Sequence, residues 1–361
     1  MNKDINKLGK INLSKTISKE YAIVERVDDS VYNSYYKHFH ILENGEIIES
    51  VEYRKYRELW RETAVNHLET TFPIHLDIEV TSYCNLLCPF CSRTHRVERN
   101  DWENKHMSLD TFKDIIDEGV PMGLKAINLN NYGESLLNKD LCKMIRYAKK
   151  KGVIDIMMHT NGTILTEKLS TELMLSGLDQ ITFSVDSITK EIYEELRVNG
   201  KFEKTVSNIR KFATIRRTLK QNKPLIRASM VLMKENAHEL DNFAEFWGSD
   251  VDSITYTDYH NQDALDKENR YVKDKKGNKS YICPSLWQRM TINVTGEVAA
   301  CCRDAGKRLE IGRYDKNNKS LLAVWNGETL KNARRLHLNK QAWKLDACRG
   351  CDHISGNQPP Q

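Results

Sequence analysis

The sequence contains no long hydrophobic run. No stretch of about 18 apolar residues occurs in its 361 residues, which excludes an ordinary membrane-spanning helix. The first ten residues, MNKDINKLGK, have no apolar segment after their charges, so we expect no secretory signal. With 40% hydrophobic and 29% charged residues, the composition is that of a globular chain of about two domains. We expect a cytoplasmic protein with no membrane partner.

A strong excess of one charge is also missing, because the formal net charge is only +5. The basic stretches at residues 216–223 and 273–279 are not interleaved with aromatic residues as in a nucleic-acid-binding module. We interpret them as solvated helix ends or loops and expect no nucleic-acid partner.

Nine cysteines without an export signal point to metal ligation in a reducing compartment rather than to disulfides. Three of them, Cys84, Cys88 and Cys91, have the spacing C-x3-C-x2-C in TSYCNLLCPFC. Three thiolates so close together can hold three corners of a cubane iron–sulfur cluster and leave one iron open. A zinc knuckle is the alternative, although zinc sites prefer two cysteine pairs that make four ligands. Three buried structural thiols are a further alternative.

This triplet resembles that of the radical S-adenosylmethionine (SAM) superfamily, and Phe90 fits because the family usually has an aromatic residue before the third cysteine. The resemblance implies a [4Fe–4S] cluster whose open iron chelates SAM. It also implies an electron donor, a flavodoxin or ferredoxin, and reductive cleavage of SAM to a 5'-deoxyadenosyl radical that abstracts hydrogen from a substrate.

From residue 74 the chain alternates strand-like and helical segments, which predicts an α/β fold with a parallel sheet. The predicted strands are residues 75–81, 125–132, 154–161, 180–186, 225–232 and 252–259. Six such units match the partial (β/α)6 barrel that the resemblance implies. The cysteine loop follows the first strand and therefore lies at the carboxyl end of the sheet, where functional groups collect.

Several strand ends carry further candidates for SAM binding. Residues 131–135 resemble the family's Gly-Gly-Glu motif, with Tyr132 in place of the first glycine, and this implies that Gly133 and Glu134 hold the SAM amino group. Asn161 and Ser184 resemble positions that bind the SAM ribose and carboxylate, although such residues are also common in turns.

Arg197 and Arg227 are candidates because arginine holds a carboxylate bidentately. For Arg197 the residues alone favour an exposed charge at a helix end, whereas Arg227 stands in an apolar strand and is expected to face the barrel interior.

A second cysteine constellation follows at Cys283, Cys301, Cys348 and Cys351, around a hairpin expected at Thr295-Gly296. It resembles the SPASM/twitch extension of radical SAM enzymes, in its short form with one auxiliary [4Fe–4S] cluster closed by these four ligands. A structural zinc site is the alternative. We expect Cys302 to be non-ligating, with a hydrogen-atom donor as the alternative role, and Cys142 to be a buried small side chain in a helix.

The predicted strands and the two cysteine groups divide the chain into four parts. These are an N-terminal extension (1–72), a barrel (73–260), a connector (261–281) and a C-terminal module of hairpin and helix (282–361). The extension is expected to contain a strand at 21–27, a hairpin that turns at Asn44-Gly45, and an amphipathic helix at 53–68. We interpret it as a cap on the barrel, with a peptide-recognition module as the alternative.

The function expected from both constellations is a radical SAM oxidoreductase, for which the sequence identifies no catalytic residue. The cysteine arrangement is similar to that of 2-deoxy-scyllo-inosamine dehydrogenases, which implies oxidation of a polar carbohydrate or aminocyclitol-like molecule, with the auxiliary cluster accepting an electron. Modification of a ribosomally made peptide, by a thioether, crosslink or epimerisation, is the alternative. A non-catalytic metal-stabilised binding protein is a third hypothesis.

Overall fold

The computed structural model describes residues 22–27, 37–42, 50–261, 266, 268–272, 277–304, 306–316 and 320–355. Its strands are β1 Ala22–Val27, β2 Lys37–Leu42, β3 His75–Ile78, β4 Ala126–Asn128, β5 Asp155–Thr160, β6 Gln180–Ser184, β7 Leu225–Leu232, β8 Ser253–Asp258, β9 Arg289–Ile292, β10 Glu297–Ala299 and β11 Glu310–Arg313. Its longer helices are α1 Val51–Val65, α2 Ser92–Glu98, α3 Leu109–Met122, α4 Leu141–Lys151, α5 Glu167–Met174, α6 Lys190–Leu196, α7 Phe202–Thr218, α8 Leu240–Trp247 and α11 Glu328–Leu338. Shorter helical turns are η3 Ser135–Leu137, η4 Ala237–Glu239, α9 Ser285–Gln288, α10 Leu321–Trp325, η6 Ala342–Lys344, α12 Asp346–Arg349 and α13 Asp352–Ser355.

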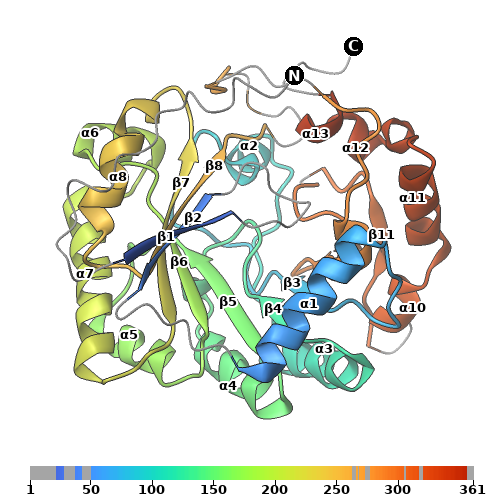
Figure 1. Ribbon diagram of the computed structural model, residues 1–361, viewed down its shortest axis with the longest axis horizontal. Coiled ribbons are helices and arrows are strands. Elements are labelled where there is room, and N and C mark those ends of the chain that lie inside the picture. The colour runs from blue at the N-terminus through green and yellow to red at the C-terminus, as the bar shows by residue number, and fades with distance from the viewer. Residues whose placement is uncertain are drawn as a thin grey trace.

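The described strands form one sheet in the order β1-β2-β8-β7-β6-β5-β4-β3-β9-β10-β11. Strands β3 to β8 are parallel neighbours in sequence order, and helices lie around their outer side (Figure 1). This is the curved α/β sheet of a partial barrel, and the six predicted barrel strands are all found within the predicted ranges.

The two faces of β7 show why the sheet separates a core from a lumen. Ile226, Ala228, Met230 and Leu232 alternate along the strand and are buried in the hydrophobic core between sheet and helices. The residues between them are only half-buried, among them Arg227, and point to the opposite face. This face lines the barrel interior, as expected for Arg227.

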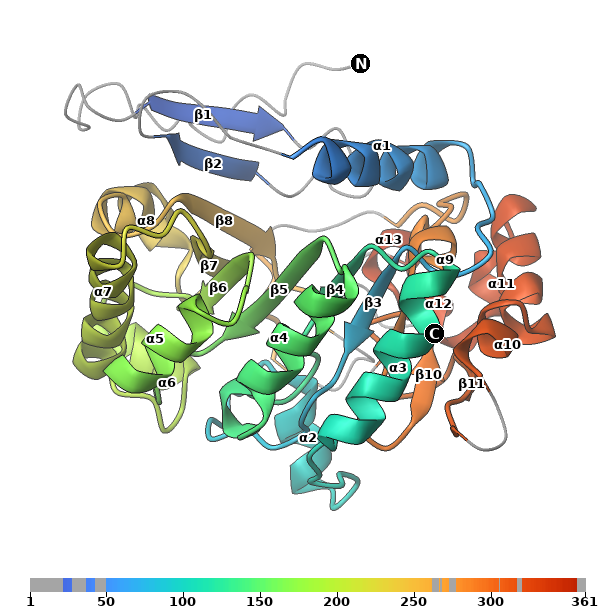
Figure 2. The same cartoon turned by 90° about the horizontal axis from the view of Figure 1, so that it is seen from below.

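Helix α1 packs at the end of the barrel where the strands begin. Its Tyr56 forms a small buried cluster with Ile74 and Ala126, which stand at the starts of β3 and β4. Figure 2 shows α1 and the β1–β2 hairpin together along one side of the molecule, with α2 on the opposite side. The helix expected at 53–68 is therefore present, and Ser50 caps its first turn by accepting from the Tyr53 N–H at 3.1 Å.

The C-terminal hairpin joins the barrel at the edge of the sheet. Strand β9 pairs in parallel with β3, so β9, β10 and β11 continue the barrel sheet. The turn does lie at Thr295-Gly296, and Gly296 adopts φ +95°, which favours glycine. The helical segment expected after β11 is broken at Asn326-Gly327 into α10 and α11.

The turn predicted at Asn44-Gly45 lies outside the described residues. No helix in the part of the chain that the structure describes is long and apolar enough to cross a bilayer.

Candidate functional site

The first cysteine loop connects β3 to α2 at the carboxyl end of the sheet. Its backbone is closed by a Cys91 N–H to Cys88 C=O bond of 3.0 Å and is tied to the end of α6 by a Leu87 N–H to Val198 C=O bond of 3.1 Å. Cys91 is the N-cap residue of α2. The loop therefore presents three thiols from a fixed backbone.

Burial makes these thiols poor thiolates on their own. Burial raises the pKa of Cys88 to about 12, and burial also raises the pKa of Cys84. A thiolate is the form that ligates a metal, so binding must supply positive charge to offset this cost. Three neighbouring cysteines that need a cation fit an iron–sulfur cluster.

Arg197 contacts this loop from the end of α6, so the interpretation as an exposed charge was wrong. Its side chain is 11% exposed, its Nη1 donates to Cys88 Sγ at 3.7 Å, and it pairs with the fully buried Asp186. Its guanidinium also lies 5.4 Å from the centre of the Phe90 ring. Burial alone would lower the pKa of Arg197, but the charges of Asp186 and Cys88 outweigh it and raise that pKa.

Gly133 is required by a close approach of two backbone segments. A Cβ atom at this position would lie 1.9 Å from the Thr81 carbonyl oxygen. The same approach lets the Glu134 N–H donate to the Tyr83 carbonyl at 2.7 Å, one residue before the first cysteine. The Gly-Glu pair thus anchors the start of the cysteine loop.

The Glu134 carboxylate is buried and held by three donors. It accepts from Thr160 Oγ1 at 2.8 Å, from the Asn161 N–H at 2.7 Å and from the Leu136 N–H at 3.2 Å. Burial raises its pKa although these bonds oppose the shift. A cationic amino group beside Glu134 would relieve that cost.

Asn161 links the end of β5 to the cysteine loop. Its Nδ2 donates to Asn85 Oδ1 at 2.9 Å, and Asn85 Nδ2 donates to Thr163 Oγ1 at 2.8 Å. Asn85 directly follows Cys84, and sequence reasoning missed it. Ser184 lies half-buried at the carboxyl end of β6, paired in register with Ser229.

The barrel lumen carries polar groups beside these strand ends. Arg227 Nε donates to Ser253 Oγ at 3.1 Å. His159 on β5 is reached by solvent although barrel atoms surround it, as expected for a side chain in an open lumen. Desolvation by those atoms and the charge of Arg227 lower the pKa of His159 to about 4, so this imidazole is neutral at pH 7.

The second group of cysteines comes from three segments: Cys283 before α9, Cys301 after β10, and Cys348 with Cys351 around α12. Burial raises the pKa of Cys351 to about 11 and raises those of Cys301 and Cys348 as well, and neighbouring thiols in the group add to each shift. Among the described residues, no three His, Cys, Asp or Glu side chains converge as they would on a single metal ion. Thiols that disfavour each other's charge fit a cationic cluster core.

Cys302 and Cys142 have different surroundings. Cys302 Sγ accepts from Arg289 Nη2 at 3.5 Å, and Arg289 also lies 3.5 Å from Asp77 on β3. Cys142 is a residue of α4 and is buried in the core, as expected from the sequence.

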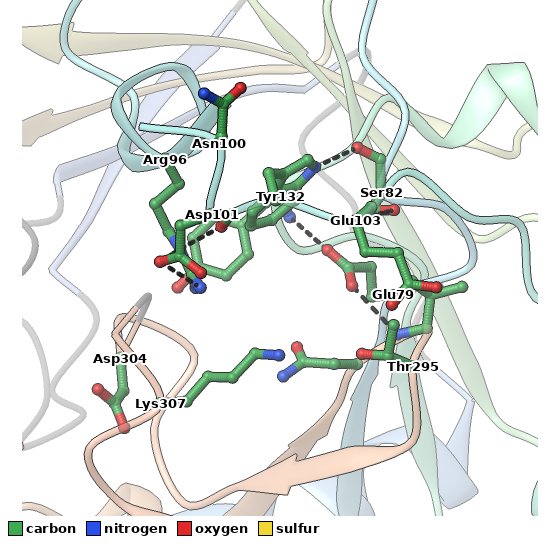
Figure 3. A pocket seen from close by; sticks show the side chains of 13 residues that line it. Glu79, Ser82, Arg96, Asn100, Asp101, Glu103, Tyr132, Thr295, Asp304 and Lys307 are labelled. Carbon is green, nitrogen blue, oxygen red and sulfur yellow. Dashed lines mark hydrogen bonds and ion pairs between the residues drawn. The ribbon is translucent and has the colours of Figure 1, made fainter. Parts of the chain in front are cut away.

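A polar cavity of about 380 Å³ lies where the barrel meets the C-terminal hairpin. Figure 3 shows Tyr132, Glu79 and Lys307 around it. Tyr132 OH donates to the Cys302 carbonyl at 3.3 Å, and Glu79 accepts from the Val294 N–H at 3.1 Å. Burial raises the pKa of Glu79 to about 7. Both contacts join the barrel to the cysteine-bearing hairpin.

A model of the radical SAM superfamily matches residues 78–246, and a model of the SPASM iron–sulfur cluster-binding domain matches residues 283–352. Residues 78–246 are accordingly a radical SAM domain, and residues 283–352 are a C-terminal SPASM domain. The cofactors of the chain are therefore a [4Fe–4S] cluster with SAM in the barrel and an iron–sulfur cluster in the SPASM domain, rather than structural zinc.

Similar proteins agree with this assignment. A probable GTP 3',8-cyclase of Methanocaldococcus jannaschii is 31% identical over 47% of this chain, and the chain spans about half the length of that relative. The structure of BtrN with AdoMet and 2-DOIA aligns with a TM-score of 0.53 at 17% identity, over 81% of this chain and 97% of BtrN. That of Streptococcus suis SuiB with the precursor peptide SuiA aligns with a TM-score of 0.59 at 15% identity, over 87% and 78% of the two chains. The last two similarities concern the fold.

The residues predicted to bind SAM lie in two places, beside the first cysteine loop and along the lumen side of the sheet. Phe90, Gly133, Glu134, Asn161 and Arg197 contact or adjoin the first cysteine loop, whereas Arg227 and Ser184 lie farther along the lumen side of the sheet. Sequence reasoning missed Asp186 and Glu79, because only folding brings each to its partner.

Proposed function

We propose that this radical SAM enzyme oxidises a polar carbohydrate or aminocyclitol-like small molecule. Cys84, Cys88 and Cys91 would hold the [4Fe–4S] cluster that binds SAM, and Cys283, Cys301, Cys348 and Cys351 would hold an auxiliary [4Fe–4S] cluster. When bound, the first cluster and SAM supply the 5'-deoxyadenosyl radical that removes a hydrogen atom. A flavodoxin or ferredoxin would supply the electron.

The observation that carries the small-molecule proposal is the cavity beside Tyr132. Its volume of about 380 Å³ is at the lower end of the range for small-molecule sites. Its lining combines the cations Arg96 and Lys307 with the carboxylates Glu79 and Asp101. Hydroxyl and amino groups of a polar ring would find both donors and acceptors there.

The chain's own residues have separate roles in this proposal. Glu134 lies beside the first cysteine loop and would hold the SAM amino group, while Arg197 keeps the Cys88 side of the loop in place. Arg227, Asn161 and Ser184 would contact the rest of SAM from neighbouring strand ends. The barrel wall and the hairpin would exclude water from the substrate.

The test is conversion of a stereospecifically deuterated alcohol substrate under strong reductant. The proposal predicts deuterium in 5'-deoxyadenosine and a carbonyl product, with both auxiliary and SAM clusters present. Product formation without label in 5'-deoxyadenosine would count against it. A matched run with the opposite deuterated position should give unlabelled 5'-deoxyadenosine.

Peptide modification is the second candidate, because the fold resembles that of SuiB, which was crystallised with the precursor peptide SuiA. A peptide substrate would have to protect the enzyme surface from hydrogen exchange on binding. We expect that no short peptide encoded near the gene protects the enzyme in this way. If one of these peptides bound tightly and was modified by the enzyme, peptide modification would replace the small-molecule proposal. Absence of SAM cleavage under reductant would instead support a non-catalytic binding protein.

A further inference from the structure

His337 stands between two cysteines of the SPASM domain. It is fully buried on α11, its Nδ1 accepts the Cys283 backbone N–H at 3.1 Å, and its Nε2 lies 3.4 Å from Cys348 Sγ. A neutral imidazole carries one proton, and a nitrogen that accepts from an amide cannot hold it. The hydrogen-bond pattern therefore places the proton on Nε2, where it is donated to the Cys348 sulfur.

Tyr281 approaches the same group from the connector. Its hydroxyl is buried and has no hydrogen-bond partner among the residues that the structure describes. Its ring stacks on His353, with centres 4.8 Å apart and planes at 18°, which fixes where the hydroxyl points. Tyr281 precedes Cys283 by two residues and His353 follows Cys351 by two residues, so the stacked rings join the chain segments that carry these two cysteines.

An unpartnered buried hydroxyl is costly, by about 1–3 kcal/mol, unless an acceptor is supplied. The sulfurs of an iron–sulfur cluster are acceptors, and hydrogen bonds to them stabilise the reduced, more negative state. Two donors on one cluster therefore make it a better electron acceptor. Groups beyond the ligands tune metal centres in this way.

We propose that His337 and Tyr281 are positioning residues that hydrogen-bond the sulfurs of the auxiliary cluster and raise its reduction potential. The inference rests on the proposed ligation by Cys283, Cys301, Cys348 and Cys351. It gives the auxiliary cluster a property that an electron acceptor needs and a purely structural cluster does not.

The experiment isolates this cluster in the full chain by the Cys84/Cys88/Cys91→Ala substitutions. Its midpoint potential is then measured by optical and EPR-monitored redox titration, with iron counted in every variant. Tyr281→Phe removes only the hydroxyl, and we expect at least a tenfold lower ratio of reduced to oxidised cluster at fixed poise, equivalent to 59 mV for a one-electron couple. His337→Leu should shift the potential in the same direction, and His337→Gln, which keeps a donor and an acceptor, should recover much of it.

Tyr56→Phe is the control, because Tyr56 is a buried tyrosine of α1 that packs at the start of the barrel strands, away from the second cysteine group. Tyr56→Phe should leave the midpoint potential of the auxiliary cluster unchanged. A shift as large as that in Tyr281→Phe would show that the effect is not local to the cluster and would overturn the inference. An unchanged potential in Tyr281→Phe and His337→Leu with full iron content would overturn the inference alone. If His337→Leu fails to assemble its cluster, Tyr281→Phe decides. Loss of the cluster from the triple-cysteine background itself would instead overturn the ligand assignment.

Discussion

The two cysteine sites are built in different ways. The first is one loop between β3 and α2, and a buried ion pair, Arg197 with Asp186, supports it. The second is assembled from three segments around a hairpin and α11, and the imidazole of His337 contacts two of these segments. The cysteine loop made from one local segment is thus held by a buried ion pair, whereas the site made from distant segments is held by the packing that joins them.

The largest expected effect comes from breaking the ion pair of the first site. Arg197→Met leaves Asp186 charged, buried and unpaired, so we expect a loss of about 3–5 kcal/mol in the free energy of unfolding. Chemical denaturation of the cluster-free chain, followed by tryptophan fluorescence, measures it. The double variant Arg197→Met/Asp186→Asn should recover part of the loss.

The matched control for that variant is Lys190→Met, which removes an exposed pair with Glu203. We expect little or no change in the free energy of unfolding there, because exposed ion pairs contribute little. Equal losses of unfolding free energy in Lys190→Met and Arg197→Met would show that the buried Arg197–Asp186 pair stabilises the fold no more than an exposed pair.

The next effect concerns Glu79, which joins the two regions through the Val294 N–H. Its pKa rises from 4.5 in the unfolded chain to about 7 in the fold, mainly through burial, so the folded state holds a proton that the unfolded state loses. Stability should therefore fall as pH rises from 4.5 to 7, by up to ~3 kcal/mol at 1.36 kcal/mol per pKa unit. Glu79→Gln should remove this part of the pH dependence of unfolding.

An exposed carboxylate serves as the control for Glu79. Glu203→Gln should keep the wild-type slope of unfolding free energy against pH. Parallel curves for wild type and Glu79→Gln would contradict the raised pKa.

A smaller loss is expected at the start of the first cysteine loop. Gly133→Ala forces a Cβ against the Thr81 carbonyl, which should cost about 1–3 kcal/mol and lower iron retention at the first cluster. Gly123→Ala is strained by a φ of +113° but has nothing within 4 Å, so it should cost about 1–2 kcal/mol with iron unchanged. Equal iron content in Gly133→Ala and Gly123→Ala would show that Gly133 has no role in holding the first cluster.

The smallest effect is expected at the contact between barrel and hairpin. Tyr132→Phe removes the hydroxyl bond to the Cys302 carbonyl and keeps the ring, which packs edge-on against Trp102 at 5.7 Å. We expect about 0.5–1.5 kcal/mol in unfolding free energy, together with a raised KM for a substrate bound in the cavity. An unchanged KM would place the substrate elsewhere.

Much of the barrel could be predicted from sequence, because its strands and helices are local periodic patterns. The loop cysteines and Gly133 were found because short motifs carry them. The pairing of β9 with β3 could not be predicted, since it depends on how a distant hairpin meets a sheet edge.

The burial of Arg197 escaped prediction for a related reason. A helix-end arginine is exposed by default, and its partner Asp186 lies in the preceding strand-to-helix loop in a left-handed conformation that the sequence does not reveal. His337 gave no signal either, because a single histidine in an amphipathic helix has no motif and becomes informative only beside Cys283 and Cys348.

We expect the chain to carry two separate iron–sulfur clusters, one on each cysteine group. Anaerobic reconstitution, with iron, sulfide and zinc counted per chain, tests it most directly when wild type is compared with the Cys84/Cys88/Cys91→Ala variant. We expect about eight iron per chain in wild type and about four in the variant, as two [4Fe–4S] clusters require. About four iron and one zinc in wild type, with no iron left in the variant, would contradict it and remove the auxiliary electron acceptor.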